Sequence, residues 1–309
     1  MITVIMPVYN EGEAIYENVH TVSRVLRSAA IEHGFLLVDD GSKDNSWQQM
    51  ERVADTLPHV TLLRLSRNFG KEAALCAALE HATGDAVVVM DADLQHPPAL
   101  IPEMVRLWRD EGYDVVDGVK ASRGEESRLK KWLVSLYYRL FARATGLAAE
   151  QLSDFKLLDK AAVLAWRALP EHNTYFRGMS AWVGYRHCSL PFEVAPRTSG
   201  KTKWSFSALL RLSVNSVIAY TAAPLLLVLV LGILMGVAAL VLTVQTLYMY
   251  FAHLAATGFS TVILLQLFIG SGLMIGLSII GLYVGKIYEE VKGRPRYLLR
   301  NKRTPDDRN

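Results

Sequence analysis

The chain is poor in cysteine: only Cys76 and Cys188 occur among its 309 residues. Two cysteines make no disulfide framework, so we expect free thiols in a reducing compartment. No signal-peptide pattern precedes the strand-like run that begins at Ile2. The net charge is +3, which is too small to indicate a nucleic-acid-binding protein. These absences together argue against a secreted, disulfide-stapled domain and against nucleic acid as a partner.

Charge is also missing from one long segment, because residues 212–285 contain no Asp, Glu, Lys or Arg. At about 20 residues for each crossing, this segment is long enough for two membrane spans, which we place near 224–244 and 261–285. Lys and Arg gather on the cytoplasmic side of membrane proteins, so both termini are predicted to be cytoplasmic. The alternative is a pair of buried core helices. The basic residues that flank the spans are Arg197, Lys201, Lys203 and Arg211 before them, and Lys286, Lys292, Arg294, Arg296, Arg300, Lys302 and Arg303 after them.

Glycine recurs in the second predicted span and suggests close contact between helices. It also leaves room for packing between subunits, so a homo-oligomer stays open. The glycines are Gly270, Gly272, Gly276, Gly281 and Gly285.

The first 115 residues alternate apolar runs with segments of helical periodicity. This βαβα order predicts an α/β domain with a mostly parallel sheet and helices on both faces. Ligands of such sheets bind beyond the carboxyl ends of the strands. The expected strands are 3–7, 35–38, 60–65, 86–90 and 114–116, and the expected helices are 14–30, 46–56 and 73–81.

Three of these strands end in polar clusters, and the most informative is Asp91-Ala92-Asp93 after the apolar run 86–90. Its two carboxylates lie at i and i+2, so they point the same way if the extended geometry persists. Oxygen ligands of this kind suit Mg²⁺ or Mn²⁺. A solvated turn after a strand is the alternative. The other clusters, Tyr9-Asn10-Glu11 and Asp39-Asp40, should meet the acid pair at one edge of a parallel sheet.

Two segments near the spans are predicted to be amphipathic helices, at about 128–143 and 203–216. In the first, apolar residues recur at i, i+3, i+4 and i+7 while Arg and Lys occupy other faces. Such a basic amphipathic helix can lie on a membrane surface. Ordinary packing against the sheet is the alternative.

Several motifs, taken in order and together with the two spans, resemble the inverting GT-A glycosyltransferases of family 2 that load a sugar onto a polyprenyl phosphate. Dolichyl-phosphate mannose synthase and bacterial undecaprenyl-phosphate glucosyltransferases are members. The resemblance implies a GT-A domain at 1–211 that includes the amphipathic helices, a transmembrane hairpin at 217–285 and a basic cytoplasmic tail at 286–309. The motifs are PVYNE (7–11), VDDGS (38–42), SRNFGK (66–71), DADLQHP (91–97), DFKL (154–157), RTSGKTKW (197–204) and GLYVGKIY (281–288).

The resemblance also implies roles on the donor side. Asp39 or Asp40 would read the base, while Asp91, Asp93 and Gln95 would hold Mg²⁺ or Mn²⁺ and so serve catalysis at the leaving diphosphate. Asn10 and Glu11 could instead be the N-cap and a first-turn acid of the helix that follows, or serve both roles. The complete predicted set for the nucleotide sugar is Pro7, Tyr9, Glu11, Val38, Asp39, Asp40, Asp91, Ala92, Asp93 and Gln95.

On the acceptor side, the resemblance points to Asp154 as a catalytic base or orienting group. A structural ion pair with Lys156 or a nearby Arg is the alternative. The lipid phosphate is expected to meet positive charge, although the same cations could simply attract anionic lipid. The predicted phosphate-binding residues are Lys120, Arg123, Arg197 and Lys203. Sugar specificity is expected within 154–182, which includes Tyr175, Arg177 and Trp182.

The expected activity is therefore transfer of a hexose, preferably glucose from UDP-glucose, to undecaprenyl phosphate at the cytoplasmic face of the inner membrane. A processive polysaccharide synthase is the first alternative, but the chain has no Gln-x-x-Arg-Trp motif and too few spans for a channel. The second alternative is an inactive membrane scaffold or a partner of a sugar-lipid flippase. Retention of the acidic positions argues against it.

Overall fold

The computed structural model describes residues 1–120, 153–169, 171, 176–193, 223–252 and 258–308. The chain divides into two compact units. One comprises Met1–Lys203 together with Arg294–Asn309, and the other comprises Trp204–Gly293. The predicted amphipathic helices at 128–143 and 203–216 lie outside the described residues.

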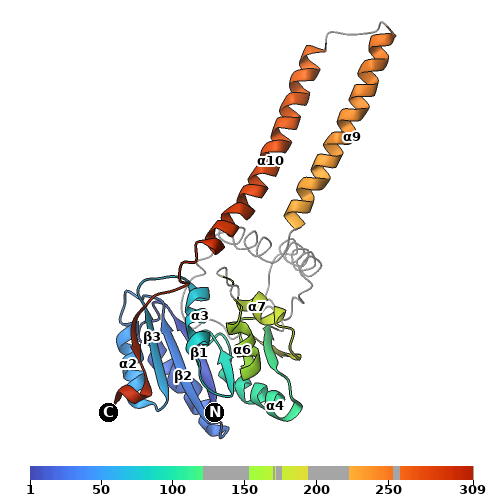
Figure 1. Cartoon of the computed structure of the whole chain (residues 1–309). Coiled ribbons are helices and arrows are strands. Elements are labelled where there is room, and N and C mark those ends of the chain that lie inside the picture. The colour runs from blue at the N-terminus through green and yellow to red at the C-terminus, as the bar shows by residue number, and fades with distance from the viewer. Residues whose placement is uncertain (121–152, 170, 172–175, 194–222, 253–257, 309) are drawn as a thin grey trace. The chain divides into compact units, whose positions relative to one another are not determined.

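The first unit is built on an eight-stranded sheet with the order β7-β5-β6-β4-β1-β2-β3-β8 (Figure 1). Neighbouring strands in the run β4-β1-β2-β3 are parallel, and β5 pairs with β7 in parallel. β6 and β8 pair antiparallel with their neighbours, so the sheet is mixed but mostly parallel, as predicted. The strands are β1 (Ile2–Val8), β2 (His33–Asp39), β3 (Val60–Leu65), β4 (Ala86–Val89), β5 (Val115–Lys120), β6 (Lys156–Asp159), β7 (His187–Phe192) and β8 (Leu299–Arg303).

Helices cover both faces of this sheet. On one face, a large apolar core joins the sheet to α1 (Ala14–Ser28), α2 (Ser46–Thr56) and α4 (Ile101–Glu111), which is preceded by the short helix η1 (Pro98–Leu100). On the other face, α3 (Lys71–His81) packs against β1, β2 and β3 and also contacts α6 (Lys160–Arg167) and α7 (Phe176–Trp182). The helical spacing of Val19, Val22 and Leu26 explains why α1 turns one apolar side to the core.

The register of the parallel strands brings their carboxyl ends to one edge. Val8 is level with Asp39, and β4 runs alongside β1 so that Val89 pairs with Ile5. The loops after β1, β2 and β4 therefore start side by side, which confirms that the three polar clusters meet at one edge of the sheet.

The basic tail adds an edge strand that its sequence did not predict. β8 pairs antiparallel with β3, with Lys302 opposite Leu63. Contacts between side chains fasten this segment: Tyr297 donates a hydrogen bond to Glu80 at 2.6 Å, Arg296 lies 3.8 Å from the same carboxylate, and Arg303 pairs with Asp55 at 2.7 Å. A short helix, η3 (Pro305–Arg308), follows.

The second unit contains two long apolar helices, α9 (Ala223–Phe251) and α10 (Phe259–Val291). Both are long and apolar enough to cross a membrane. Gly272 and Gly276 are the positions where α9 comes closest, because a Cβ at Gly272 would lie 2.6 Å from the sulfur of Met235 and one at Gly276 would lie 3.1 Å from Val228. The glycines predicted to allow close helix contact do so at these two positions.

Candidate active site

A cavity of about 310 Å³ opens at the carboxyl ends of β1 and β4. Most of the residues predicted to bind the nucleotide sugar line it, whereas Val38, Asp39 and Gln95 do not. The lining comprises Pro7, Val8, Tyr9, Glu11, Asp40, Asn68, Gly70, Lys71, Ala74, Asp91, Ala92 and Asp93.

The two acids after β2 have different surroundings. Asp39 is fully buried, accepts a hydrogen bond from the Ser42 amide at 2.8 Å and pairs with Arg64 at 3.0 Å. Asp40 lines the cavity, and its two oxygens accept from the amides of Phe69 and Gly70 at 2.7 and 2.9 Å. Of the two acids predicted to read the base, only Asp40 therefore faces the cavity. Its carboxylate also holds the loop 66–70 in place.

Gly41 is required at the turn after these acids. Its φ is +69°, and a Cβ would lie 2.4 Å from the carbonyl carbon of Arg67. Any side chain there would collide with backbone in a conformation that L-residues rarely adopt. Gly41 thus lets the loops after β2 and β3 approach each other beneath the cavity.

The loop after β1 is fastened to the loop after β2. The amides of Asn10 and Glu11 donate to the hydroxyls of Ser42 and Ser46, each at 3.0 Å, and Asn10 Oδ1 accepts from the Lys43 amide at 2.9 Å. The alternative that Asn10 or Glu11 caps the next helix is wrong, because the N-cap residue of α1 is Glu13. The polar side chain of Asn10 is used to join the two loops instead.

The acid pair after β4 presents oxygen atoms to the cavity. Asp93 is exposed, and its Oδ1 accepts from the Gln95 amide at 3.1 Å. Asp91 is partly buried and donates its amide to Nδ1 of His96 at 3.1 Å. The His96 ring is stacked on Phe155 with centroids 5.0 Å apart, which fixes the start of this loop. Asp91 is therefore not in a fully solvated turn, which was the alternative.

The donor set at this loop fits Mg²⁺ or Mn²⁺. Asp91, Asp93 and Gln95 offer oxygen ligands only, and two carboxylates beside a cavity are typical of a cation that also binds substrate phosphates. Within the described residues, no group of three or more His, Cys, Asp or Glu side chains has the geometry of a complete metal site.

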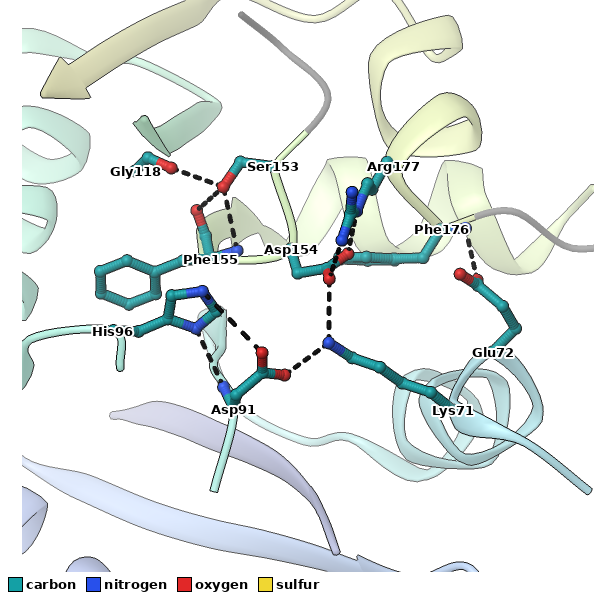
Figure 2. Close-up of polar contacts among 10 residues, drawn as sticks. All are labelled: Lys71, Glu72, Asp91, His96, Gly118, Ser153, Asp154, Phe155, Phe176 and Arg177. Atoms are coloured by element: carbon teal, nitrogen blue, oxygen red, sulfur yellow. Dashed lines mark hydrogen bonds and ion pairs between the residues drawn. The ribbon is translucent and has the colours of Figure 1, made fainter. Parts of the chain in front are cut away.

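Asp154 lies beside this acid pair and is held by two cations (Figure 2). Its Oδ2 accepts from Lys71 Nζ at 2.9 Å, and the guanidinium of Arg177 forks onto both carboxylate oxygens at 2.6 and 2.5 Å. Lys71 also pairs with Asp91 Oδ1 at 2.5 Å. Lys71 thus joins the predicted metal-binding acid to the predicted acceptor-side acid.

These contacts change the acidity of the site. Burial would raise the pKa of Asp154, but Arg177 and then Lys71 outweigh it and lower the pKa well below its usual range. Glu72, the neighbour of Lys71, accepts from the Phe176 amide at 2.7 Å. Burial raises the pKa of Glu72 to about 7, with Asp154 contributing in the same direction. Asp154 is therefore a carboxylate at neutral pH, whereas Glu72 titrates there.

The predicted phosphate-binding cations fall mostly outside the described part of the chain. Arg123, Arg197 and Lys203 lie in segments that are not described, as does Tyr175. Lys120 is the last residue of β5, but its side chain is likewise not described. Their assignment to the lipid phosphate stays a prediction.

The family model for glycosyl transferase family 2 matches residues 3–163, which is more than half of the chain. The chain belongs to glycosyl transferase family 2. This match spans β1 to β6 and includes the acid pair and Asp154.

Relatives of this family 2 glycosyltransferase match it nearly end to end. The bactoprenol glucosyl transferase of Shigella phage SfII is 32% identical and covers 97% of each chain. The prophage bactoprenol glucosyl transferase homolog of Escherichia coli is 31% identical over 97% of this chain and 98% of its own. The uncharacterized glycosyltransferase YkcC of Bacillus subtilis is 34% identical over 96% and 92%.

Solved structures share the fold at lower similarity. The mannosyltransferase PcManGT from Pyrobaculum calidifontis, in complex with GDP-Man and Mn²⁺, is 20% identical with a TM-score of 0.46, and the match covers 89% of this chain and 86% of that one. Glucosyl-3-phosphoglycerate synthase from Mycobacterium tuberculosis, in complex with Mn²⁺ and UDP-glucose, is 19% identical with a TM-score of 0.45 over 71% and 77%. The match to family 2 and the mixed, mostly parallel sheet give this chain the predicted GT-A-like domain, which is followed by two helices able to span a membrane.

Two side chains that contact Asp154 in this glycosyltransferase were not assigned to it from sequence. Lys71 and Arg177 hold Asp154 from 83 and 23 residues away along the chain. The only sequence signals were the motif around Lys71 and the inclusion of Arg177 in the segment expected to determine specificity. The alternative predicted for Asp154, an ion pair with Lys156 or a nearby Arg, is confirmed for an Arg and wrong for Lys156, which pairs with Asp117 instead.

Proposed function

We propose that this chain transfers a hexose, preferably glucose, from a nucleoside diphosphate sugar to a polyprenyl phosphate with inversion at the anomeric carbon. The observation that carries the proposal is the cavity at the strand ends, where Asp91 and Asp93 face the site and Lys71 connects Asp91 to Asp154. The names of the relatives support bactoprenol as the acceptor and glucose as the sugar.

On the donor side, the ring of Tyr9 is 43% exposed at the cavity and is placed to stack on a base, while Asp40 faces the same space. A divalent cation held by Asp91, Asp93 and Gln95 would supply neutralising charge to the departing diphosphate. Lys71 adds a further positive charge beside it.

The acceptor needs alignment more than deprotonation. A phosphate monoester has a second pKa of about 6, so it is largely ionised at pH 7. Its oxygen attacks the anomeric carbon, and the bond from that carbon to the diphosphate breaks with its electron pair leaving on the nucleotide. Because Arg177 and Lys71 keep the pKa of Asp154 low, this carboxylate orients the two cations rather than collecting a proton.

The site would face the cytoplasm, with α9 and α10 crossing the inner membrane and both termini on the cytoplasmic side. This placement puts the cavity on the side of the membrane where nucleotide sugars are made. Arg197, Lys203, Lys120 and Arg123 are proposed to receive that phosphate.

The activity is tested with the full chain purified in detergent, undecaprenyl phosphate, Mg²⁺ or Mn²⁺ and a panel of labelled nucleotide sugars. Labelled sugar should move into the organic phase, with UDP-glucose as the preferred donor. Binding of a nucleotide sugar without turnover of any of them would overturn the enzymatic proposal.

Asp93→Ala tests the proposed cation site. Because Asp93 is exposed, the substitution should leave the fold intact while it weakens Mn²⁺ binding at least 10-fold and reduces turnover on the order of 100-fold. Titration with Mn²⁺ followed by electron paramagnetic resonance measures the first effect separately from activity. Asp110→Ala, at an exposed acid on α4, is the matched control and should change neither. Unchanged Mn²⁺ affinity in Asp93→Ala would remove Asp93 from the site.

A further inference from the structure

A fully buried ion pair lies behind Asp154. Lys156 on β6 and Asp117 on β5 are each 0% exposed, and Lys156 Nζ is 2.9 Å from Asp117 Oδ1. Asp117 Oδ2 also meets His187 Nδ1 at 2.9 Å. Burial of two charges costs several kcal/mol for each ion before their attraction is counted, so such a pair adds little net stability. A role in positioning is a better reason for charge at this point in the core.

The same lysine holds α7. Lys156 Nζ donates to Ser180 Oγ at 2.6 Å, and Ser180 Oγ donates in turn to the carbonyl oxygen of Arg177 at 3.1 Å. Lys156 Nζ also lies 5.5 Å from the centre of the Phe176 ring, a cation–π distance. Phe176 and Ser180 of this short helix therefore contact one buried ammonium group, and Ser180 links it to the backbone of Arg177.

Two contacts thus connect α7 to β6 and to Asp154, which precedes that strand. Arg177 forks onto Asp154, and Ser180, three residues later, accepts from Lys156, two residues after Asp154. The inner contact is buried, since Ser180 is 1% exposed, whereas the Arg177 side chain is 36% exposed. The buried contact between Ser180 and Lys156 holds α7 in place, and the more exposed contact between Arg177 and Asp154 lies at the site.

We propose that Lys156 is a positioning residue of this glycosyltransferase, which holds α7 through Ser180 so that Arg177 keeps the carboxylate of Asp154 in its working orientation. Asp117 pairs with the Lys156 ammonium and holds it in place inside the core. The inference rests on the proposed function only for the role of Asp154 in transfer. It makes the catalytic geometry depend on a hydroxyl that touches no substrate.

Ser180→Ala tests the proposal, because it removes the acceptor of Lys156 and leaves the charged pair intact. A shift of about 1 Å at a reacting group can cost about 100-fold in rate, so we expect kcat to fall roughly 10- to 100-fold. The KM for the nucleotide sugar should stay within about 2-fold, because no residue of α7 lines the cavity.

Ser23→Ala is the matched control. Ser23 is 2% exposed on α1 and bonds His33 at 3.0 Å, so it loses a buried hydroxyl contact that does not touch the site. It should lower the thermal midpoint about as much as Ser180→Ala while kcat stays at the wild-type value. A Ser180→Ala enzyme with wild-type kcat would overturn the proposal.

A double-mutant cycle with Arg177→Lys separates positioning from general weakening. If Ser180 acts through Arg177, the double variant should be no more than about 2-fold slower than Arg177→Lys alone. Multiplication of the two losses would contradict the proposal.

Two further variants at Ser180 complete the test. Ser180→Cys, with similar volume and a weak acceptor, replaces Ser180→Ala if that variant does not fold, with the same expected loss of kcat. Ser180→Thr keeps the hydroxyl and should restore most of kcat. A wild-type protein without turnover would instead count against the proposed function, so the two failures are distinguishable.

Discussion

At the scale of single residues, Lys71 is the centre of the site. It contacts an acid on each side, Asp91 at 2.5 Å and Asp154 at 2.9 Å, and both raise its pKa against the effect of burial. A charged lysine between the two acids makes Asp91 and Asp154 electrostatically dependent on each other. A ligand that binds Asp91 would compete with Lys71 for this carboxylate and so change the interaction of Lys71 with Asp154.

Glu72 predicts a pH dependence of stability. Its pKa rises from 4.5 to about 7 in the folded protein, so the folded state holds a proton that the unfolded state has already lost in this range. The stabilisation is complete below about pH 4.5 and is lost as the pH rises through about 7, and it amounts to no more than about 3 kcal/mol. Relative to wild type, Glu72→Gln should therefore gain stability between pH 5 and pH 8.

Unfolding of the detergent-solubilised protein, followed by tryptophan fluorescence at both pH values, measures this difference. Glu17→Gln, at an exposed acid on α1, is the control and should show no such divergence from wild type. A constant difference between Glu72→Gln and wild type at the two pH values would contradict the expectation.

Sequence could predict which residues lie near the site but not how they pair. The positions of Asp40, Asp91 and Asp93 followed from the strands that precede them, since parallel strands end at one edge. The partners of Asp154 did not follow, because Arg177 reaches it through α7 and no short-range pattern encodes that packing. Asp39 likewise pairs with Arg64 and does not reach the cavity because β2 lies beside β3, and a motif does not specify that strand pairing.

At the scale of elements, the strands with strong apolar runs were predicted and the polar ones were not. β1 to β4 are buried and rich in Val, Ile and Leu, which is the pattern of central parallel strands. β8 reads Leu-Arg-Asn-Lys-Arg and is mostly exposed. An edge strand can be this polar, because only its backbone has to pair, and its sequence then resembles that of a solvated tail.

Truncation after Gly293 tests the contribution of β8. It leaves the edge of β3 unpaired and removes the contacts of Tyr297 with Glu80 and of Arg303 with Asp55. We expect the thermal midpoint to fall by roughly 5–10 °C and aggregation to increase, because an open edge strand pairs with other chains.

Truncation after Thr304 is the matched control, since it keeps β8 and removes only η3. Differential scanning fluorimetry measures the thermal midpoint of both variants, and size-exclusion chromatography measures their aggregation. Equal stability and dispersity of the two truncated proteins would show that β8 contributes nothing.

At the scale of the whole molecule, composition alone was sufficient to find α9 and α10. A run of 74 residues without charge has few structural solutions, and two helices of 29 and 33 residues are one of them. The side of the membrane on which each end lies rests on the distribution of Lys and Arg, which biases insertion without fixing it.

Cysteine labelling tests that orientation. In a Cys76→Ala, Cys188→Ser background, Thr257→Cys, between the two spans, should react with a membrane-impermeant maleimide on intact cells. Lys302→Cys, at an exposed position of β8, should react only after the cells are opened. The reverse pattern would place the catalytic domain on the other side and would contradict the proposed localisation.

The pairing of β8 with β3 has a consequence for how the protein is made. A ribosome reaches Leu299 only after it has synthesised α9 and α10, whereas β3 has left it more than 200 residues earlier. The outer edge of β3 therefore stays unpaired while the two apolar helices are synthesised, because β8 follows them in the sequence. The sheet can thus be completed only after both apolar helices have been synthesised, so a chain that stops before them also lacks the edge strand β8.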